Sequence, residues 1–89
     1  MVKVLFTPNI QRHVQCPAQT VNADSVRRAL DEVFASNPQA RSYVLDERGA
    51  VRRHIVIFVN GQPIRDRQQL SDAVGHSDEV YVFQALSGG

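Results

Sequence analysis

Apolar residues recur at helical spacing in one segment of the chain. They follow the pattern i, i+3, i+4, i+7 and i+8 at Val26, Ala29, Leu30, Val33 and Phe34. This spacing puts them on one stripe of a helix. Asn22 or Asp24 is expected to cap the start of that helix. The helix should end at Asn37, because a residue that precedes proline avoids helical backbone angles.

The other apolar runs are short, rich in β-branched and aromatic residues and bounded by turn residues, which is typical of strands. Strands are therefore expected at Val2–Phe6, within 13–21, at 54–59 and at 78–86. Pro17 weakens the second of them, because proline cannot donate to a ladder. Residues 46–49 should form a turn between two extended arms, and Asn60-Gly61 a tight turn. Residues 70–74 are expected to make a short helical turn that ends at Gly75.

This order of elements predicts an α+β roll, in which one main helix lies across a mixed sheet of four or five strands. At 89 residues the chain is near the lower limit for a single apolar core. We expect one folded domain over residues 1–86 and an extended tail over residues 87–89.

The third and last predicted strands are apolar at consecutive positions, although one helix can cover only one face of the sheet. The helix is expected to cover the face with Ile55, Ile57, Val59, Val80 and Val82. The side chains left on the opposite face are then Val56, Phe58, Tyr81 and Phe83. An exposed apolar patch of this kind marks a partner site. The alternative is that residues 38–50 fold over these side chains.

Composition excludes several classes of function. The net charge of +1 gives no electrostatic case for binding nucleic acid or an anionic membrane. No apolar run approaches the roughly 20 residues of a membrane helix, and the first residues are too short a run for a secretion signal. Cys16 is the only cysteine, so no disulfide forms within the chain, which favours the reducing cytoplasm.

The polar candidates give weaker signals. The three histidines have no ligand spacing, so no metal site is expected. Cys16 should pack as a small apolar residue. Arg27 and Arg28 are expected to pair with the neighbouring acidic residues Asp31 and Glu32. A second basic group could face a partner, and it comprises Arg52, Arg53, Arg65 and Arg67.

The chain finishes with Gly88 and Gly89, which no fold requires. Two glycines make the thinnest peptide and adopt conformations that are barred to other residues. Such an end can pass through a narrow channel into another protein's active site. The reactive group would be the α-carboxylate of Gly89, which becomes open to attack by sulfur or nitrogen nucleophiles once ATP has adenylated it. Nothing in this chain performs that reaction, so the chain is expected to be a substrate and no enzyme.

The segments "VNG" (59–61), "DEV" (78–80) and the final "GG" resemble, in this order, the ubiquitin-like β-grasp sulfur carriers. These include the small subunit of molybdopterin synthase, the thiamine-pathway carrier and the carrier of a thiocarboxylate route to cysteine. The long segment "RSYVLDERGAVRR" is more like the cysteine-route carrier. Ser87 stands where a small apolar residue is more usual.

The resemblance implies that an activating enzyme uses ATP to adenylate Gly89, and that a persulfide-derived sulfur then gives a thiocarboxylate. Gly88 would be its slender neighbour, and no cofactor would be bound by the chain itself. The resemblance also implies a surface for partner enzymes on the last strands, formed by Val56, Phe58, Tyr81, Phe83 and Leu86.

Three functions therefore stay open: a sulfur carrier, a protein modifier joined through Gly89 to lysines of its targets, and a binding module with an incidental tail. A carrier would act on an acceptor such as a cysteine synthase or the large subunit of molybdopterin synthase. A modifier could build chains only poorly, because Lys3 is its one lysine. A monomer with transient partners is expected.

Overall fold

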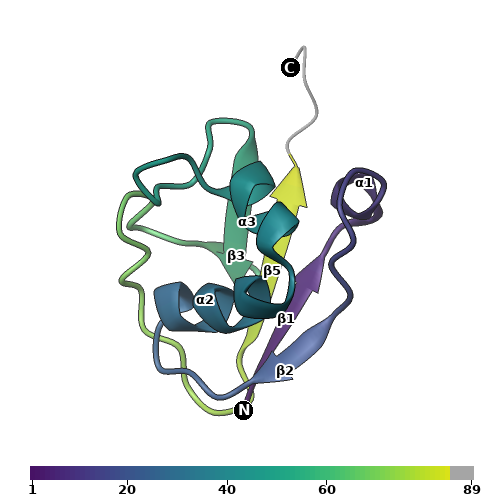
Figure 1. Ribbon diagram of the computed structural model, residues 1–89. Coiled ribbons are helices and arrows are strands. Elements are labelled where there is room, and N and C mark those ends of the chain that lie inside the picture. Colours follow the sequence, from purple (N-terminus) through teal and green to yellow (C-terminus); the bar gives the residue numbers. More distant parts are fainter. Residues whose placement is uncertain (85–89) are drawn as a thin grey trace.

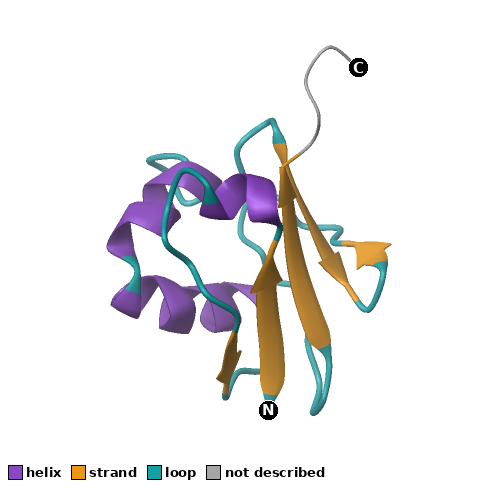
Figure 2. Ribbon diagram, turned by 90° about the vertical axis from the view of Figure 1, so that its right-hand side faces the viewer, coloured by secondary structure: helices purple, strands orange, loops and turns teal. Residues whose placement is uncertain are grey.

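The computed structural model describes residues 1–84, which form one five-stranded sheet with three helices on one side (Figures 1 and 2). The strands are β1 (Val2–Phe6), β2 (Gln19–Val21), β3 (Ile55–Val59), β4 (Gln62–Pro63) and β5 (Glu79–Gln84). The helices are α1 (Pro8–Gln11), α2 (Val26–Ser36) and α3 (Pro38–Val44). The predicted α+β class is confirmed.

The sheet has the strand order β2-β1-β5-β3-β4. The first and last strands, β1 and β5, are parallel neighbours at its centre, and the other pairs are antiparallel. The predicted mixed sheet is therefore confirmed. Because β5 pairs with β1 on one side and with β3 on the other, the last strand of the described chain is held on both edges.

Helix α2 matches its predicted apolar stripe, since all five predicted positions are buried. The predicted caps were wrong. Ser25 is the N-cap, and its hydroxyl accepts a hydrogen bond from the backbone N–H of Arg28 at 3.2 Å. Asn37 ends the helix as expected, and its side chain donates to the Val33 carbonyl at 2.9 Å.

The segment before the 46–49 turn was expected to be extended, and this prediction was wrong. It forms α3, with Pro38 in the first turn, where its missing N–H costs no hydrogen bond. Ala40 and Val44, one helical turn apart, are fully buried on the same side of the sheet as α2. Residues 38–50 therefore do not cover the opposite face of the sheet, and that alternative is excluded.

Two other segments differ from prediction. Only residues 19–21 of the strand expected over 13–21 pair with β1. Residues 70–74 make no helical turn, because Leu70 has left-handed backbone (φ 56°) and its side chain is fully buried. The Asp66 carboxylate holds this loop instead, by accepting hydrogen bonds from the backbone N–H groups of Gln68, Gln69 and Ser71.

The two predicted turns are present. Asn60 and Gly61 both have positive φ angles (51° and 85°), which is the geometry of a tight hairpin turn between β3 and β4. In the 46–49 turn, the Asp46 carboxylate accepts from the N–H groups of Arg48 and Ala50.

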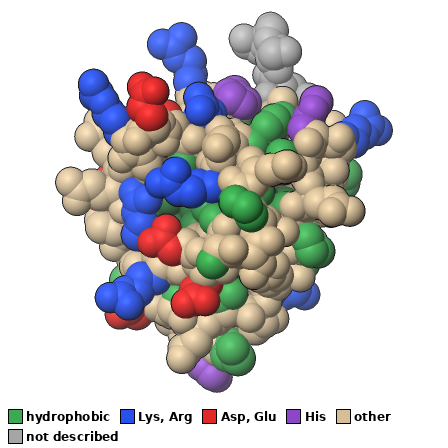
Figure 3. Space-filling view, in the orientation of Figure 1, with side chains coloured by type: hydrophobic (Ala, Val, Ile, Leu, Met, Phe, Trp, Pro, Cys, Tyr) green, Lys and Arg blue, Asp and Glu red, His purple; other side chains and the backbone are tan. Residues whose placement is uncertain are grey.

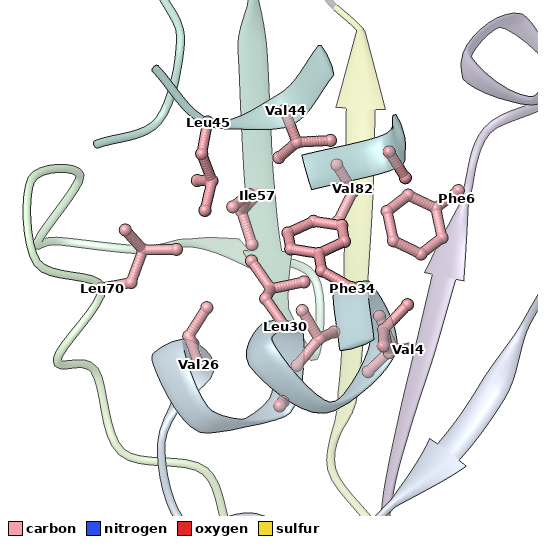
Figure 4. Close-up of a cluster of buried hydrophobic side chains, with 14 of the residues drawn as sticks. Val4, Phe6, Val26, Leu30, Phe34, Val44, Leu45, Ile57, Leu70 and Val82 are labelled. Carbon is pink, nitrogen blue, oxygen red and sulfur yellow. The ribbon is translucent and has the colours of Figure 1, made fainter. Parts of the chain in front are cut away.

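The core lies between the helices and the inner face of the sheet. Leu30 and Phe34 of α2 meet Val4, Ile57 and Val82 of the three central strands (Figure 4). Within residues 1–84 no polar side chain is buried. The buried apolar side chains of the strands thus point to the inner face, and no helix of residues 1–84 covers the outer face.

The Asp66 loop generates a pH-dependence. Hydrogen bonds from the Gln69 N–H and the Ser71 hydroxyl lower the pKa of Asp66 to about 2. A carboxylate whose pKa is lowered in the folded state adds stability above its ordinary pKa of about 3.9 and loses it as the pH falls toward the lowered value. We expect the free energy of unfolding, measured with urea, to fall between about pH 4 and pH 2.

Asp66→Asn is the matched variant, since it keeps the shape and removes the charge. We expect it to be less stable than the wild type at neutral pH, with the difference shrinking as the pH falls. Asp46 and Asp78 also have lowered pKa values, so the wild-type curve alone does not isolate Asp66. Parallel curves for the two proteins would contradict the prediction.

Candidate functional site

The outer face of the sheet carries the predicted aromatic side chains. In the antiparallel pairing of β3 with β5, Phe58 lies opposite Tyr81 and Val56 lies opposite Phe83. The Phe83 ring centroid is 5.1 Å from that of Phe58 and 4.5 Å from that of Tyr81. Phe83 is 38% exposed, and the other three are half-buried. Their outward orientation is confirmed, whereas their role in binding stays a prediction.

Sequence reasoning missed Leu5 of β1. Val2, Val4 and Phe6 are buried on the inner face, so Leu5 points outward, where the parallel register places it beside Tyr81. The alternation within Val2–Phe6 could have shown this. We use the name sheet patch for these five outward side chains: Leu5, Val56, Phe58, Tyr81 and Phe83.

A depression of about 310 Å³ opens on the sheet patch. It is lined by Phe58, Asn60, Gly61, Glu79, Tyr81 and Phe83. One wall is rigid, because the Asn60 side chain accepts from the Glu79 N–H at 2.9 Å and donates to Asp78 at 2.8 Å. The depression therefore has an aromatic floor and a polar end.

A second group of side chains surrounds the end of β5. The Tyr43 hydroxyl of α3 donates to the Gln84 side-chain oxygen at 2.6 Å. The His13 ring stacks on Tyr43 at 5.3 Å, and the His54 ring meets its edge at 6.0 Å. Three segments far apart in sequence thus converge on the last residue of the described chain.

The predicted tail lies outside the described residues. This holds for Leu86, Ser87, Gly88 and Gly89, and for the domain boundary after residue 86. The prediction for each of them stays a prediction.

The structure separates the predicted basic group. Arg52 is half-buried and donates from Nε to the Ser42 carbonyl at 2.8 Å, and Arg67 donates to the carbonyls of Arg52 and Ile55. The side chains of these two arginines therefore bind backbone carbonyl groups within the fold. Arg53 is exposed before β3, whereas exposed Arg65 follows β4 beside the Asp72 carboxylate, which accepts from the Arg65 N–H.

The predicted pairing of Arg27 and Arg28 with Asp31 and Glu32 was wrong. Arg27 donates to the carbonyls of Gly49 at 2.8 Å and Gln69 at 3.1 Å, which ties α2 to two loops. Arg28 pairs with Asp24 at 3.9 Å on an exposed surface. In the part of the chain that the structure describes, no three His, Cys, Asp or Glu side chains gather as a metal site would require. None of the helices over residues 1–84 could cross a membrane.

Cys16 is buried as predicted, with 1% of its surface exposed, and burial raises the pKa of its thiol to about 11. Only the thiolate is nucleophilic, so the folded protein should be nearly inert to thiol reagents. We expect the native protein to react with a disulfide reagent at pH 8 about two to three orders of magnitude more slowly than the same protein in denaturant. Equal rates in the two states would contradict the burial of this thiol.

This chain is similar to known proteins in sequence and in structure. The sequence profile of the ThiS family matches residues 10–89. No curated protein sequence matched in the search. The structure of the Amycolatopsis orientalis BexX/CysO complex holds a similar chain, with 22% identity and a TM-score of 0.81, and the match covers 100% of each chain.

Two other solved structures are similar. CysO of Mycobacterium tuberculosis has 19% identity and a TM-score of 0.80, over 97% of this chain and 100% of that one. SAMP1 of Haloferax volcanii, a small archaeal modifier protein, has 25% identity and a TM-score of 0.77, over 99% of this chain and 98% of that one. The predicted β-grasp fold is confirmed by these likenesses. Because the family profile covers most of the sequence, the chain belongs to the ThiS family of ubiquitin-like β-grasp sulfur carriers.

Proposed function

We propose that this protein carries sulfur as a thiocarboxylate on Gly89 and is acted on by partner enzymes in the cytoplasm. The observation that carries the proposal is the continuity between the uncovered sheet patch and the end of β5, in a chain of the ThiS family. A partner that binds Tyr81 and Phe83 also holds the strand that leads to Gly89. Five residues span no more than about 18 Å, so Gly89 stays within that distance of Gln84.

The proposed cycle needs ATP and a persulfide, both handled by partners. A carboxylate oxygen of Gly89 attacks the α-phosphorus of ATP and displaces pyrophosphate. The terminal sulfur of a partner's persulfide then attacks the acyl carbon, and AMP leaves. A thiol reduces the resulting acyl disulfide, which leaves the thiocarboxylate on Gly89 and a disulfide on the partner.

The sheet patch would bind the activating enzyme and the sulfur acceptor. Aromatic side chains contribute most to interfaces when a partner removes them from water. Phe83 is exposed enough to gain from such contact, and the depression beside it would receive apolar side chains of the partner. The resemblance of the segment "RSYVLDERGAVRR" to the cysteine-route carrier favours an acceptor of the cysteine synthase kind, with the large subunit of molybdopterin synthase as the other candidate.

The second candidate is a protein modifier, and the likeness to SAMP1 favours it. The same adenylate on Gly89 would then be attacked by a lysine of a target protein. Both functions share the activation step, and they differ in the nucleophile that follows.

Intact mass spectrometry separates the candidates. The protein is incubated with a ThiS-type activating enzyme, ATP and a persulfide donor. We expect a mass gain equal to the replacement of one oxygen by one sulfur, and no gain in a variant that lacks Gly89. Covalent adducts on lysines of other proteins would support the modifier instead. No change with any activating enzyme would contradict both candidates.

Truncation of Phe83 tests the sheet patch. We expect Phe83→Ala to weaken binding to the activating enzyme about tenfold or more, because it removes an aromatic contact from the interface. Phe83 also packs against Phe58 and Tyr81, so some loss of thermal stability is expected, and binding is measured at a temperature at which the variant is fully folded. Thr20→Ala is the control, because Thr20 lies in the edge strand β2, outside the sheet patch. Equal effects of the two substitutions would overturn the role of the patch.

A further inference from the structure

The charges of this chain are segregated, although the net charge is only +1. All nine acidic residues lie in three segments, 24–32, 46–47 and 66–79. The segments that meet around the end of β5 contain none. They are residues 7–15, 37–45, 50–58 and 82–84, and together they carry four arginines: Arg12, Arg41, Arg52 and Arg53.

The contacts of Tyr43 bring these segments together. Its ring lies between His13 and His54, and its hydroxyl binds Gln84. Arg12 and Arg53 are the chain neighbours of the two histidines. Basic side chains and histidines accordingly gather at the end of the molecule toward which β5 points (Figure 3).

Three of the four arginines form no side-chain hydrogen bond or ion pair with the rest of residues 1–84. Arg52 donates a hydrogen bond to the Ser42 carbonyl, so its side chain already has a partner within the fold. Arg12, Arg41 and Arg53 are exposed, and within residues 1–84 their guanidinium groups make no hydrogen bond or ion pair. We use the name arginine rim for these three. The adjacent 46–49 turn carries Asp46, Glu47 and Arg48, which is one negative charge in net, so the three arginines of the rim remain in excess.

A partner that acts on Gly89 cannot avoid the arginine rim. Gly89 stays within about 18 Å of Gln84, so the mouth of the partner's active site must come close to the residues around Gln84. Carboxylates at that mouth would attract the arginine side chains of the rim. Such complementarity of charge speeds association and fixes the orientation of the two proteins.

We infer that the arginine rim binds an acidic surface around the mouth of the activating enzyme's active site and orients the chain as its end enters. This inference rests on the proposed function. RNA is the less suitable partner, because binding to RNA depends mainly on attraction to phosphates and the net charge of the chain is only +1.

Steady-state kinetics of adenylation by the activating enzyme of the same organism test the inference. The rate is measured as the release of pyrophosphate. We expect Arg12→Gln with Arg53→Gln to raise KM for the carrier about tenfold at low salt, with kcat unchanged. The difference from wild type should shrink as salt is added. Arg28→Gln with Lys3→Gln is the matched control, because it removes the same charge from exposed sites outside the rim, and its KM should change less than threefold or so.

Each other outcome has a meaning. If both double variants raise KM equally, the effect is one of net charge and the rim is overturned. If neither does, or the control has the larger effect, the rim is overturned and the proposed function stands. If the wild type is never adenylated, the proposed function fails and the rim with it. Rim-dependent binding of a 5′-labelled poly(U) strand with unchanged KM would assign the rim to RNA and overturn the inference.

Discussion

The position of β5 between two partner strands is the constraint on which the rest of this structure depends. The last strand pairs in parallel with β1 and antiparallel with β3, so its backbone is fixed on both edges. Its inward side chains, Val80 and Val82, are fully buried beneath α2 and α3. A chain end that leaves such a strand departs from the most constrained part of the sheet, at a point set by the fold.

The helices of residues 1–84 cover only one face of the sheet, and this follows from the same arrangement. Three short helices lie on the inner face, and no other helix or strand among residues 1–84 covers the outer one. The outer side chains of β1, β3 and β5 therefore stay together as the sheet patch. Their aromatic content costs solubility, and a protein that needed only to fold could place polar residues there. The cost is understandable where the surface is needed for partners, as in the proposed function.

The sheet patch could be predicted from the sequence because the number of helices limits how many faces of the sheet are covered. One helix covers one face, and strands that are apolar at consecutive positions must expose the other. The alternation of Leu5 with the buried Val4 and Phe6 in β1 carries the same information. Helix α3 was missed because seven residues with two buried positions give too little periodicity to tell a helix from an extended arm. The loop at Leu70 was missed because the apolar spacing of residues 70–74 does not show that Leu70 adopts left-handed backbone or that the Asp66 side chain takes the hydrogen bonds of the neighbouring N–H groups. The arginines show the same limit: Arg27, Arg52 and Arg67 bind backbone carbonyls brought near by the tertiary fold, so their sequence neighbours did not predict their partners.

The two surfaces around the chain end suit different parts of a binding event. The sheet patch is small and apolar, so it gives affinity that depends on close contact and sets how fast a complex dissociates. The arginine rim acts over a longer range and sets how fast and in what orientation a complex forms. In the proposed function the protein must leave its activating enzyme before it meets the acceptor, because both would need Tyr81 and Phe83. Such a cycle favours moderate affinity with rapid association, and a small aromatic patch beside unpaired arginines supplies that combination. Stronger apolar contact would slow the release on which the transfer of sulfur depends.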